Sequence, residues 1–504
     1  SNFAAGVNAG NSIASGGNFN TVVGDEAGTA LTTGDDNTAL GYGALYSEDA
    51  HGKNTAIGTN SLLTLNAGAD GNNTAVGYFS GKLITTGLRN TIIGSEAGDA
   101  LTTSADNVAV GTQSLSAETT GLYSVAVGQG ALASQNNSGD AQIHNVAVGY
   151  QAGVAITTGI QNTLVGSKAG DALTDADFNI ALGMSALGAD TKGNKSVAIG
   201  VGALSTQNFT SSTDSHNTAV GNSAGNAVTT GTDNTLIGSL CGDAITDGNT
   251  NTALGSLSLS GNQRGDRNTA IGHEALKVMN PSGDADTYNT AVGYQSGIAT
   301  NTGTNNTLIG SRAGNSITSG SNNVNIGFDT DSGADANNTI TIGINISGAD
   351  NDFSFGKASN VVSNDFDADA AFSRSSDERL KKNIANQTLG LDFINDLRTV
   401  KYNWKASDEL DSTDNQLKHL RREDEDGNII NDMNTDVVLH NFIAQEVKTA
   451  LDKAGVSEFG GWKEDKYGVQ QVSREMFVIP LVKAMQELSA KNDALEARIK
   501  TLEG

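Results

Sequence analysis

The segment "SSDERLKKNI" at residues 375–384 holds the residue types with the clearest chemical potential in this 504-residue chain. A serine hydroxyl such as that of Ser376 is a poor nucleophile until a base takes its proton, and a lysine amine can be that base if its pKa falls toward neutrality. The nearest lysine, Lys381, follows five residues later. Two side chains five residues apart do not lie together on a regular helix or on a regular strand. A contact between them would therefore require a bend in the chain. The segment equally fits an ordinary helix start with Ser376 as N-cap.

Three other features could react or bind, and each has a simpler explanation. Cys241 is the only cysteine and stands in "GSLCG" where sister segments have "GSEAG" or "GSKAG", which favours a small core residue over a reactive thiol. His144 and His216 end equivalent loops, but Asn and Tyr take that place in other copies, so no repeated metal site is expected. The acidic run "DTDSGAD" at 329–335 lacks the spacing of a calcium loop. We therefore predict neither a metal nor a cofactor.

Charge is unevenly divided along the chain. The sequence holds 30 Lys+Arg and 56 Asp+Glu, and residues 1–372 contribute 11 of the former and 32 of the latter. A field of this sign repels phosphate backbones and anionic lipids, which argues against nucleic-acid binding. No apolar run approaches the length that spans a bilayer, so membrane insertion is not expected.

A 72-residue repeat organises residues 1–346. The segment "NTAVGYFSG" at 73 recurs as "NVAVGYQAG" at 145, "NTAVGNSAG" at 217 and "NTAVGYQSG" at 289. Each block nests shorter units, mostly of 17 residues with a longer fourth one. Five blocks therefore give about twenty turns of an elongated repeat architecture. The composition agrees, because 62 Gly and 5% aromatic residues do not suit one ordinary globular core.

The unit "NTAVG" predicts a short strand. Its second and fourth residues point to one face and its third, nearly always Ala, to the other. Gly at the fifth position allows a tight corner, while Asn at the first tolerates left-handed geometry and can stack its amide on the next turn. We predict a mainly β fold, a parallel β-roll or β-solenoid rod, whose flat Ala face packs closely against an equally flat surface. Inserts in the longer turns, near residues 64, 133, 205 and 277, should project from one side.

These repeats resemble the head repeats of YadA-like trimeric autotransporter adhesins. The family signature is close to "SVAIG", which occurs here at 196, and "SVAVG" occurs at 124. The resemblance implies a homotrimer of left-handed β-rolls that associate along a three-fold axis.

The repeat decays over residues 347–372, which we interpret as a linker. Beyond it lie both tryptophans, Trp404 and Trp462, among helical patterns, so residues 373–504 are predicted to form a small α+β domain. Within that domain, "EDEDGNII" at 423–430 predicts a hairpin turn around its Asp-Gly pair.

The end of the chain, at about residues 478–503, predicts a coiled coil. Apolar residues there alternate spacings of three and four, and such a seam requires partner helices, three in a homotrimer. Asn492 on the seam can fix register and oligomer number at some cost in stability. The seam consists of Val478, Leu481, Met485, Leu488, Asn492, Leu495, Ile499 and Leu502.

Four segments of the last domain resemble the intramolecular chaperone auto-processing domain at the ends of phage tail spikes and fibres. They are "SDERLKKNI" at 376, "LRTVKYNWK" at 397, "FIAQEV" at 442 and "FVIPLVKAMQELSAKNDALEARI" at 477. The resemblance implies a domain that trimerises, templates the folding of the preceding β-structure, and then removes itself with a Ser/Lys dyad.

The family motif, Ser-Asp with a Lys five residues after the Ser, maps onto Ser376, Asp377 and Lys381. It implies that Ser376 is the nucleophile and Lys381 the base of a single-turnover serine endopeptidase without external substrates. Scission is then expected next to Ser376, at the bond that joins it to Ser375, while the spacing alone leaves the bond on its other side open. Lys382 is the alternative base. The residues expected to support the motif are Asp377, Arg379, Lys382 and Asn383.

The combined resemblance implies a phage tail fibre, a structural and receptor-binding rod of the virion. Its partners would be a host-surface receptor, either a glycan or an outer-membrane component, and other tail or baseplate proteins bound through a part preceding Ser1. A bacterial cell-surface trimeric adhesin that uses the same chaperone is one alternative. A glycan-degrading tail spike is another, but no turn has acids that stand apart from those of its sister turns.

Overall fold

The structure, a computed structural model, describes residues 1–139, 141–366, 373–374, 376–423, 428–430, 435–436 and 438–504. The chain divides into two compact units, Ser1–Ser375 and Ser376–Gly504. The boundary between the units therefore falls at the Ser375–Ser376 bond, where cleavage is expected.

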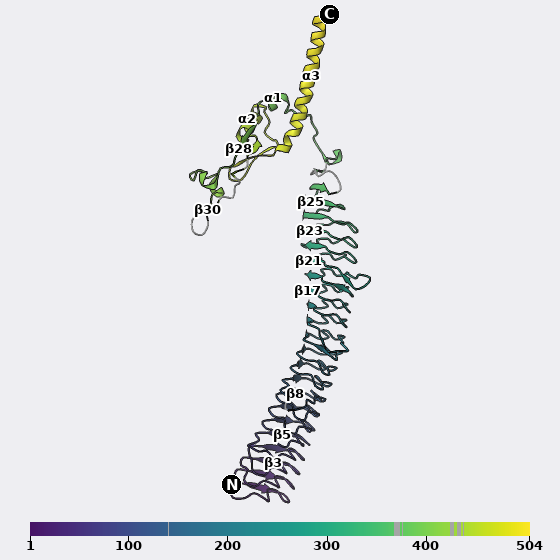
Figure 1. Ribbon diagram of the computed structural model, residues 1–504, viewed down its shortest axis with the longest axis vertical. Coiled ribbons are helices and arrows are strands. Elements are labelled where there is room, and N and C mark those ends of the chain that lie inside the picture. Colours follow the sequence, from purple (N-terminus) through teal and green to yellow (C-terminus); the bar gives the residue numbers. More distant parts are fainter. Residues whose placement is uncertain (140, 367–372, 375, 424–427, 431–434, 437) are drawn as a thin grey trace. The chain divides into compact units, whose positions relative to one another are not determined.

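The first unit is a parallel β-solenoid of about 21 turns, whose strands stack one above another along the unit (Figure 1). Neighbouring strands pair in register, so that Thr38 lies beside Thr55 and Ala39 beside Ala56. This arrangement confirms the predicted mainly β fold and solenoid architecture. The three-residue strands of the ladder are β1 (Phe3–Ala5), β2 (Thr21–Val23), β3 (Thr38–Leu40), β4 (Thr55–Ile57), β5 (Thr74–Val76), β6 (Thr91–Ile93), β7 (Val108–Val110), β8 (Val125–Val127), β9 (Val146–Val148), β10 (Thr163–Val165), β11 (Ile180–Leu182), β13 (Val197–Ile199), β15 (Thr218–Val220), β16 (Thr235–Ile237), β17 (Thr252–Leu254), β19 (Thr269–Ile271), β21 (Thr290–Val292), β22 (Thr307–Ile309) and β23 (Val324–Ile326).

The Ala face of the ladder lies inside the solenoid. The middle residue of most strands, such as Ala56 or Ala75, is fully buried and belongs to one continuous core with turn residues such as Leu62. The first and third strand residues point outward, and Leu254 and Ile309 keep 48% and 40% of their surface exposed. The expectation that the Ala face packs against another surface is therefore wrong. Most turns have Ala at this buried position, while others have a fully buried larger residue such as Leu164 or Leu236.

A ladder of buried asparagines runs beside the strands. Asn234 is representative: its Oδ1 accepts the N–H of Asn251 at 3.0 Å, and its Nδ2 donates to the carbonyl of Gly248 at 2.8 Å. The predicted stacking of the Asn amides on the next turn is thus confirmed. The left-handed residue, however, is the one before each Asn, as at Asp233 with a φ of 59°. The chain turns the corner one residue earlier than expected, which leaves the Asn side chain directed inward.

The inserts of two longer turns add short parallel strands to the solenoid. One insert pairs β14 (Thr213–Asp214) with β12 (Gly193–Asn194), and the next pairs β20 (Ala285–Asp286) with β18 (Gly265–Asp266). These parts of the inserts are therefore held against the preceding turn by backbone hydrogen bonds.

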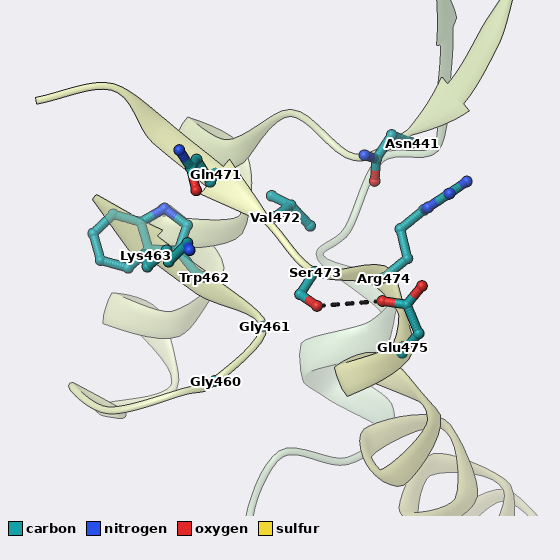
Figure 2. A pocket seen from close by; sticks show the side chains of 10 residues that line it. All are labelled: Asn441, Gly460, Gly461, Trp462, Lys463, Gln471, Val472, Ser473, Arg474 and Glu475. Atoms are coloured by element: carbon teal, nitrogen blue, oxygen red, sulfur yellow. Dashed lines mark hydrogen bonds between the residues drawn. The ribbon is translucent and has the colours of Figure 1, made fainter. Parts of the chain in front are cut away.

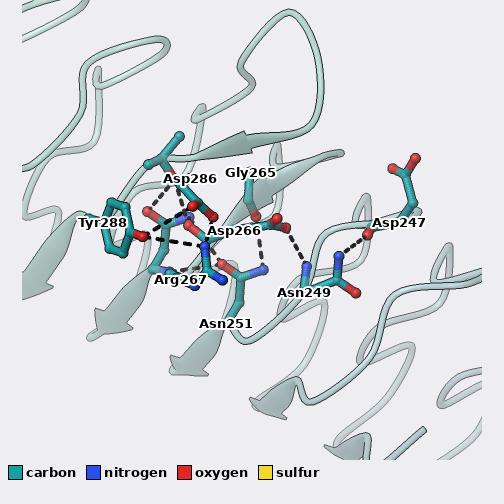
Figure 3. Close-up of polar contacts among 10 residues, drawn as sticks. Asp247, Asn249, Asn251, Gly265, Asp266, Arg267, Asp286 and Tyr288 are labelled. Atoms are coloured by element: carbon teal, nitrogen blue, oxygen red, sulfur yellow. Dashed lines mark hydrogen bonds and ion pairs between the residues drawn. The ribbon is translucent and has the colours of Figure 1, made fainter.

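Side chains reinforce this edge of the solenoid. Arg267 forms an ion pair with Asp286, and the hydroxyl of Tyr288 donates to the same carboxylate at 3.1 Å (Figure 3). In the turn before, Asp266 Oδ1 accepts the N–H of Asn249 at 2.6 Å. The contacts Arg267–Asp286 and Asn249–Asp266 each join one turn to the next, whereas that of Tyr288 lies within the insert.

The ladder ends in an antiparallel hairpin. Strand β24 (Ile340–Ile344) pairs with β25 (Asp352–Lys357) in parallel, whereas β26 (Asn360–Asp365) runs antiparallel to β25 and pairs with β27 (Ser373–Arg374). Residues 347–372, expected to be a linker, thus contain two of these strands, and the end of that segment lies outside the described residues. The domain division drawn from the sequence stays a prediction.

The second unit contains helices and small antiparallel sheets. The paired strands are β28 with β31, β29 with β30 and β32 with β33. Phe393, Val447, Leu451 and Phe477 form part of its core. Its elements are η1 (Glu378–Leu380), α1 (Leu391–Asn395), β28 (Val400–Tyr402), η2 (Ser407–Glu409), η3 (Lys418–Leu420), β29 (Arg422–Glu423), β30 (Ile429–Ile430), β31 (Leu439–Asn441), α2 (Ala444–Lys453), β32 (Trp462–Glu464), β33 (Gln470–Val472), η4 (Arg474–Phe477) and α3 (Val478–Glu503).

Two sequence predictions for this unit involve β30 and α3. The strands β29 and β30 form the two arms of the predicted hairpin, while its turn residues Asp426 and Gly427 lie outside the described residues. The predicted helix near the end of the chain is present as α3, and its seam residues Leu488, Leu495 and Leu502 are exposed in the single chain.

No helix in the described part of the chain has the length and apolarity needed to cross a membrane.

Candidate functional site

The structure brings Ser376 and Lys381 into hydrogen-bond contact. The Nζ of Lys381 donates to the Oγ of Ser376 at 2.7 Å. The contact depends on the 3₁₀ turn η1, which follows an extended Asp377 and ends where the N–H of Lys381 donates to the carbonyl of Glu378. The bend that the five-residue spacing requires is therefore present. Both side chains are exposed in the single chain.

Asp377 and Arg379 stabilise this turn. The carboxylate of Asp377 caps η1 by accepting the N–H of Arg379 at 2.9 Å, and it also accepts guanidinium hydrogen bonds at 3.0 and 2.6 Å. This pairing with Arg379 holds the pKa of the Asp377 carboxyl below its ordinary value. The N-cap of the turn is thus Asp377, and not Ser376 as the helix-start interpretation predicted. The hydroxyl of Ser376 instead accepts the hydrogen bond from Lys381.

The remaining motif residues lie beside the turn. Lys382 is exposed and, within the described chain, takes part in no side-chain hydrogen bond or ion pair. Asn383 is exposed with a φ of 57°, so the backbone turns again directly after the two lysines. Ser375, expected on the other side of the scissile bond, lies outside the described residues.

Residues 376–456 match the family model of the chaperone of endosialidase. This chaperone-of-endosialidase segment begins at Ser376, which is also the first residue of the second compact unit. The family is a peptidase family, and the match supports a trimerisation and autoprocessing chaperone role for the C-terminal domain. The chain has no match among the curated proteins or the solved structures compared with it. The match ends before α3, so the coiled coil stays a prediction.

The second unit also has pockets away from Ser376 and Lys381. One pocket of about 490 Å³ is lined by Gly460, Gly461, Trp462 and neighbouring residues, and it contains a second serine, Ser473 (Figure 2). The hydroxyl of Ser473 donates to a carboxylate oxygen of Glu475 at 3.2 Å. Ser473 thus has a carboxylate as its partner, whereas Ser376 has the amine of Lys381. The pocket does not repeat the arrangement of Ser376 and Lys381.

Cys241 is a core residue, as the sequence favoured. Its side chain is fully buried, and its Sγ contacts the Oγ of Ser258 at 3.2 Å. Burial raises the pKa of the Cys241 thiol to about 11, which keeps it protonated and unreactive.

The sequence reasoning missed a set of buried acids in the turns that precede the longer turns of the solenoid. Glu118 and Asp190 are fully buried, and each accepts a hydrogen bond from a glutamine, Gln135 or Gln207, that follows 17 residues later. That repeated offset of acid and amide in two blocks was the available signal. Finding it requires aligning the inserts, which differ in sequence much more than the strands do.

Proposed function

We propose that this chain is a subunit of a trimeric fibre whose C-terminal domain directs assembly and then removes itself by cutting next to Ser376. The observation that carries the proposal is the 2.7 Å contact between Lys381 Nζ and Ser376 Oγ, at the first residue of the family match. It supports Ser376 as the nucleophile and Lys381 as the base.

The proposed reaction is one acyl transfer followed by hydrolysis. Lys381 takes the hydroxyl proton as the base, and Ser376 Oγ attacks the carbonyl carbon of residue 375. The peptide C–N bond breaks, the acyl group passes to the oxygen, and the ammonium of Lys381 returns the proton to the leaving nitrogen. Water then hydrolyses the ester, which frees the upstream carboxylate and restores the hydroxyl of Ser376.

Two apolar surfaces support a homotrimer. The outward residues of the solenoid ladder form an apolar stripe along the first unit, exposed in the single chain at positions such as Ile237 and Leu254. The seam of α3 is likewise exposed, with 58% of Leu495 accessible. Contiguous exposed apolar surfaces often mark an interface. The association of the matched family with trimerisation suggests further copies of this chain as the partners.

We place the rod at the surface of a virion as a receptor-binding tail fibre, with a bacterial surface adhesin as the alternative. The inserts support a lateral receptor role, because they vary in sequence while the strands between them do not. A host glycan or outer-membrane component is the proposed receptor, and tail or baseplate proteins are the proposed anchoring partners.

Denaturing electrophoresis of four forms of the full chain tests the cleavage proposal. Wild type is expected to separate into two fragments, whereas Ser376→Ala and Lys381→Ala remain whole. Lys382→Ala is the matched control, since it removes the same charge one residue away, and it should be cut like wild type. If all four stay intact, the domain is a permanent trimerisation cap. If Lys382→Ala is blocked and Lys381→Ala is cut, the base has been assigned to the wrong lysine.

A further inference from the structure

The turns that precede the longer turns of the solenoid show how a buried acid is normally compensated in this protein. The carboxylate of Glu118 accepts five hydrogen bonds, four from backbone N–H groups and one from Gln135. Asp190 accepts four in the same manner, including one from Gln207. In the next block the glutamine is replaced by Met279, and the acid is replaced by the neutral Asn262. In these three blocks, a buried acid is therefore present only where a glutamine follows 17 residues later.

The first block breaks this rule at Glu48. The side chain of Glu48 is fully buried, yet Leu65 stands where the glutamine would be, 17 residues later. Within the described residues the carboxylate accepts two hydrogen bonds, from the N–H groups of His51 and Ala67, both at 3.2 Å. This acid is therefore the least compensated of the series.

A histidine occupies the same turn. His51 stands where the other three blocks have Gly121, Gly193 and Gly265. Its Nδ1 is buried without a hydrogen-bond partner among the described residues and lies 3.7 Å from Glu48 Oε1. Asp49 brings a further carboxylate, and one ligand atom from each of the three side chains lies within 4.8 Å of the others.

The distance of 3.7 Å between His51 Nδ1 and Glu48 Oε1 suits two ligands of one ion better than a direct hydrogen bond. A charge-assisted N–H···O bond would be about 2.8 Å long. Two ligands that each lie about 2.1 Å from one tetrahedral metal ion, at an angle of about 109°, are about 3.4 Å apart. Imidazole and carboxylate together are ligands that zinc accepts.

We propose that Glu48, Asp49 and His51 bind one divalent transition-metal ion of the zinc type in the turn that precedes the first longer turn. The ion supplies the positive charge that the buried carboxylate lacks. Because Glu48 also accepts the N–H of Ala67 in the insert, the ion ties the turn and the insert together. The site is structural and independent of the self-cleavage proposed for the second unit.

Zinc titration of the untagged, chelator-treated full chain by isothermal calorimetry tests this site. We expect one zinc ion per chain with a dissociation constant at or below about 10 µM, and a higher thermal midpoint of the zinc-loaded protein. The variant His51→Gly, which installs the residue of the other three blocks, should weaken binding by about tenfold or more.

The matched control is His216→Asn. His216 also lies on the solenoid surface, 3.4 Å from a single carboxylate, Asp233, so its loss should leave zinc binding unchanged. The proposal is wrong if wild type releases no heat with zinc, if His51→Gly binds as wild type does, or if His216→Asn loses as much affinity as His51→Gly. Circular dichroism of each variant verifies that the solenoid is folded in every comparison.

Discussion

At the scale of single residues, the contact between Lys381 and Ser376 depends on a neighbour, Asp377. Asp377 caps the 3₁₀ turn and pairs with Arg379, and this turn is what places Lys381 against Ser376. The sequence motif paired Ser376 with Lys381, and the structure brings these two side chains into contact, while their roles stay a prediction. It could not show the turn that joins them, because a short capped turn and an ordinary helix start share the same residue types.

The Asn ladder predicts a large effect from one buried side chain. Replacement Asn234→Ala leaves the N–H of Asn251 and the carbonyl of Gly248 without partners in a buried position. The free energy of unfolding should fall by about 2 kcal/mol, measured as an earlier midpoint of denaturation by circular dichroism. The exposed Asn222→Ala is the control and should change stability little. Equal midpoints for the two variants would contradict a structural role of the ladder.

The buried acid Asp190 predicts a pH dependence of stability. Burial raises the pKa of its carboxyl in the folded protein above the unfolded value. Its favourable contribution is therefore fully present below the unfolded pKa and is lost as pH rises through the folded pKa. The stability of wild type relative to Asp190→Asn should be higher at pH 4 than at pH 8, measured from thermal midpoints of both proteins. An unchanged or opposite difference would show that the hydrogen bonds to Asp190 outweigh its desolvation.

At the scale of elements, the repeat predicted the strands and the alternation of their two faces. It did not predict which of the two faces lies inside the solenoid. Alternation in "NTAVG" shows that two faces exist, but which face is inside depends on how tightly each turn closes. Ala56 is buried because the opposite side of its own turn packs on it, while Leu254 points outward. The corner residue was misplaced by one position for the same reason, since only the closed turn shows where the chain must reverse.

The exposed seam of α3 predicts an assembly role for that helix. Leu495→Asp places a charge on the predicted interface and should reduce trimer formation by the full chain, measured by light scattering after size exclusion. Lys500→Asp adds the same residue off the seam and should leave the trimer intact. If both variants remain trimeric, α3 does not contribute to association as a coiled coil.

At the scale of the whole molecule, the outward stripe of the solenoid predicts that the rod itself associates. Leu254→Glu introduces a charge into this stripe, where nearly half of the leucine is exposed in one chain. We expect a lower thermal midpoint of the assembled rod and a larger fraction of monomer. The exposed Gln263→Glu is the control and should behave as wild type. A trimer of unaltered stability in Leu254→Glu would show that the stripe is not the interface.

The central claim is that the second unit is a folding device which releases itself at Ser376. Intact mass measurement of the purified wild-type chain under denaturing conditions tests it most directly. The account predicts two species, one of which has the mass of residues 376–504 and begins with Ser376. A single species with the mass of all 504 residues, or a cut elsewhere in the chain, would contradict it.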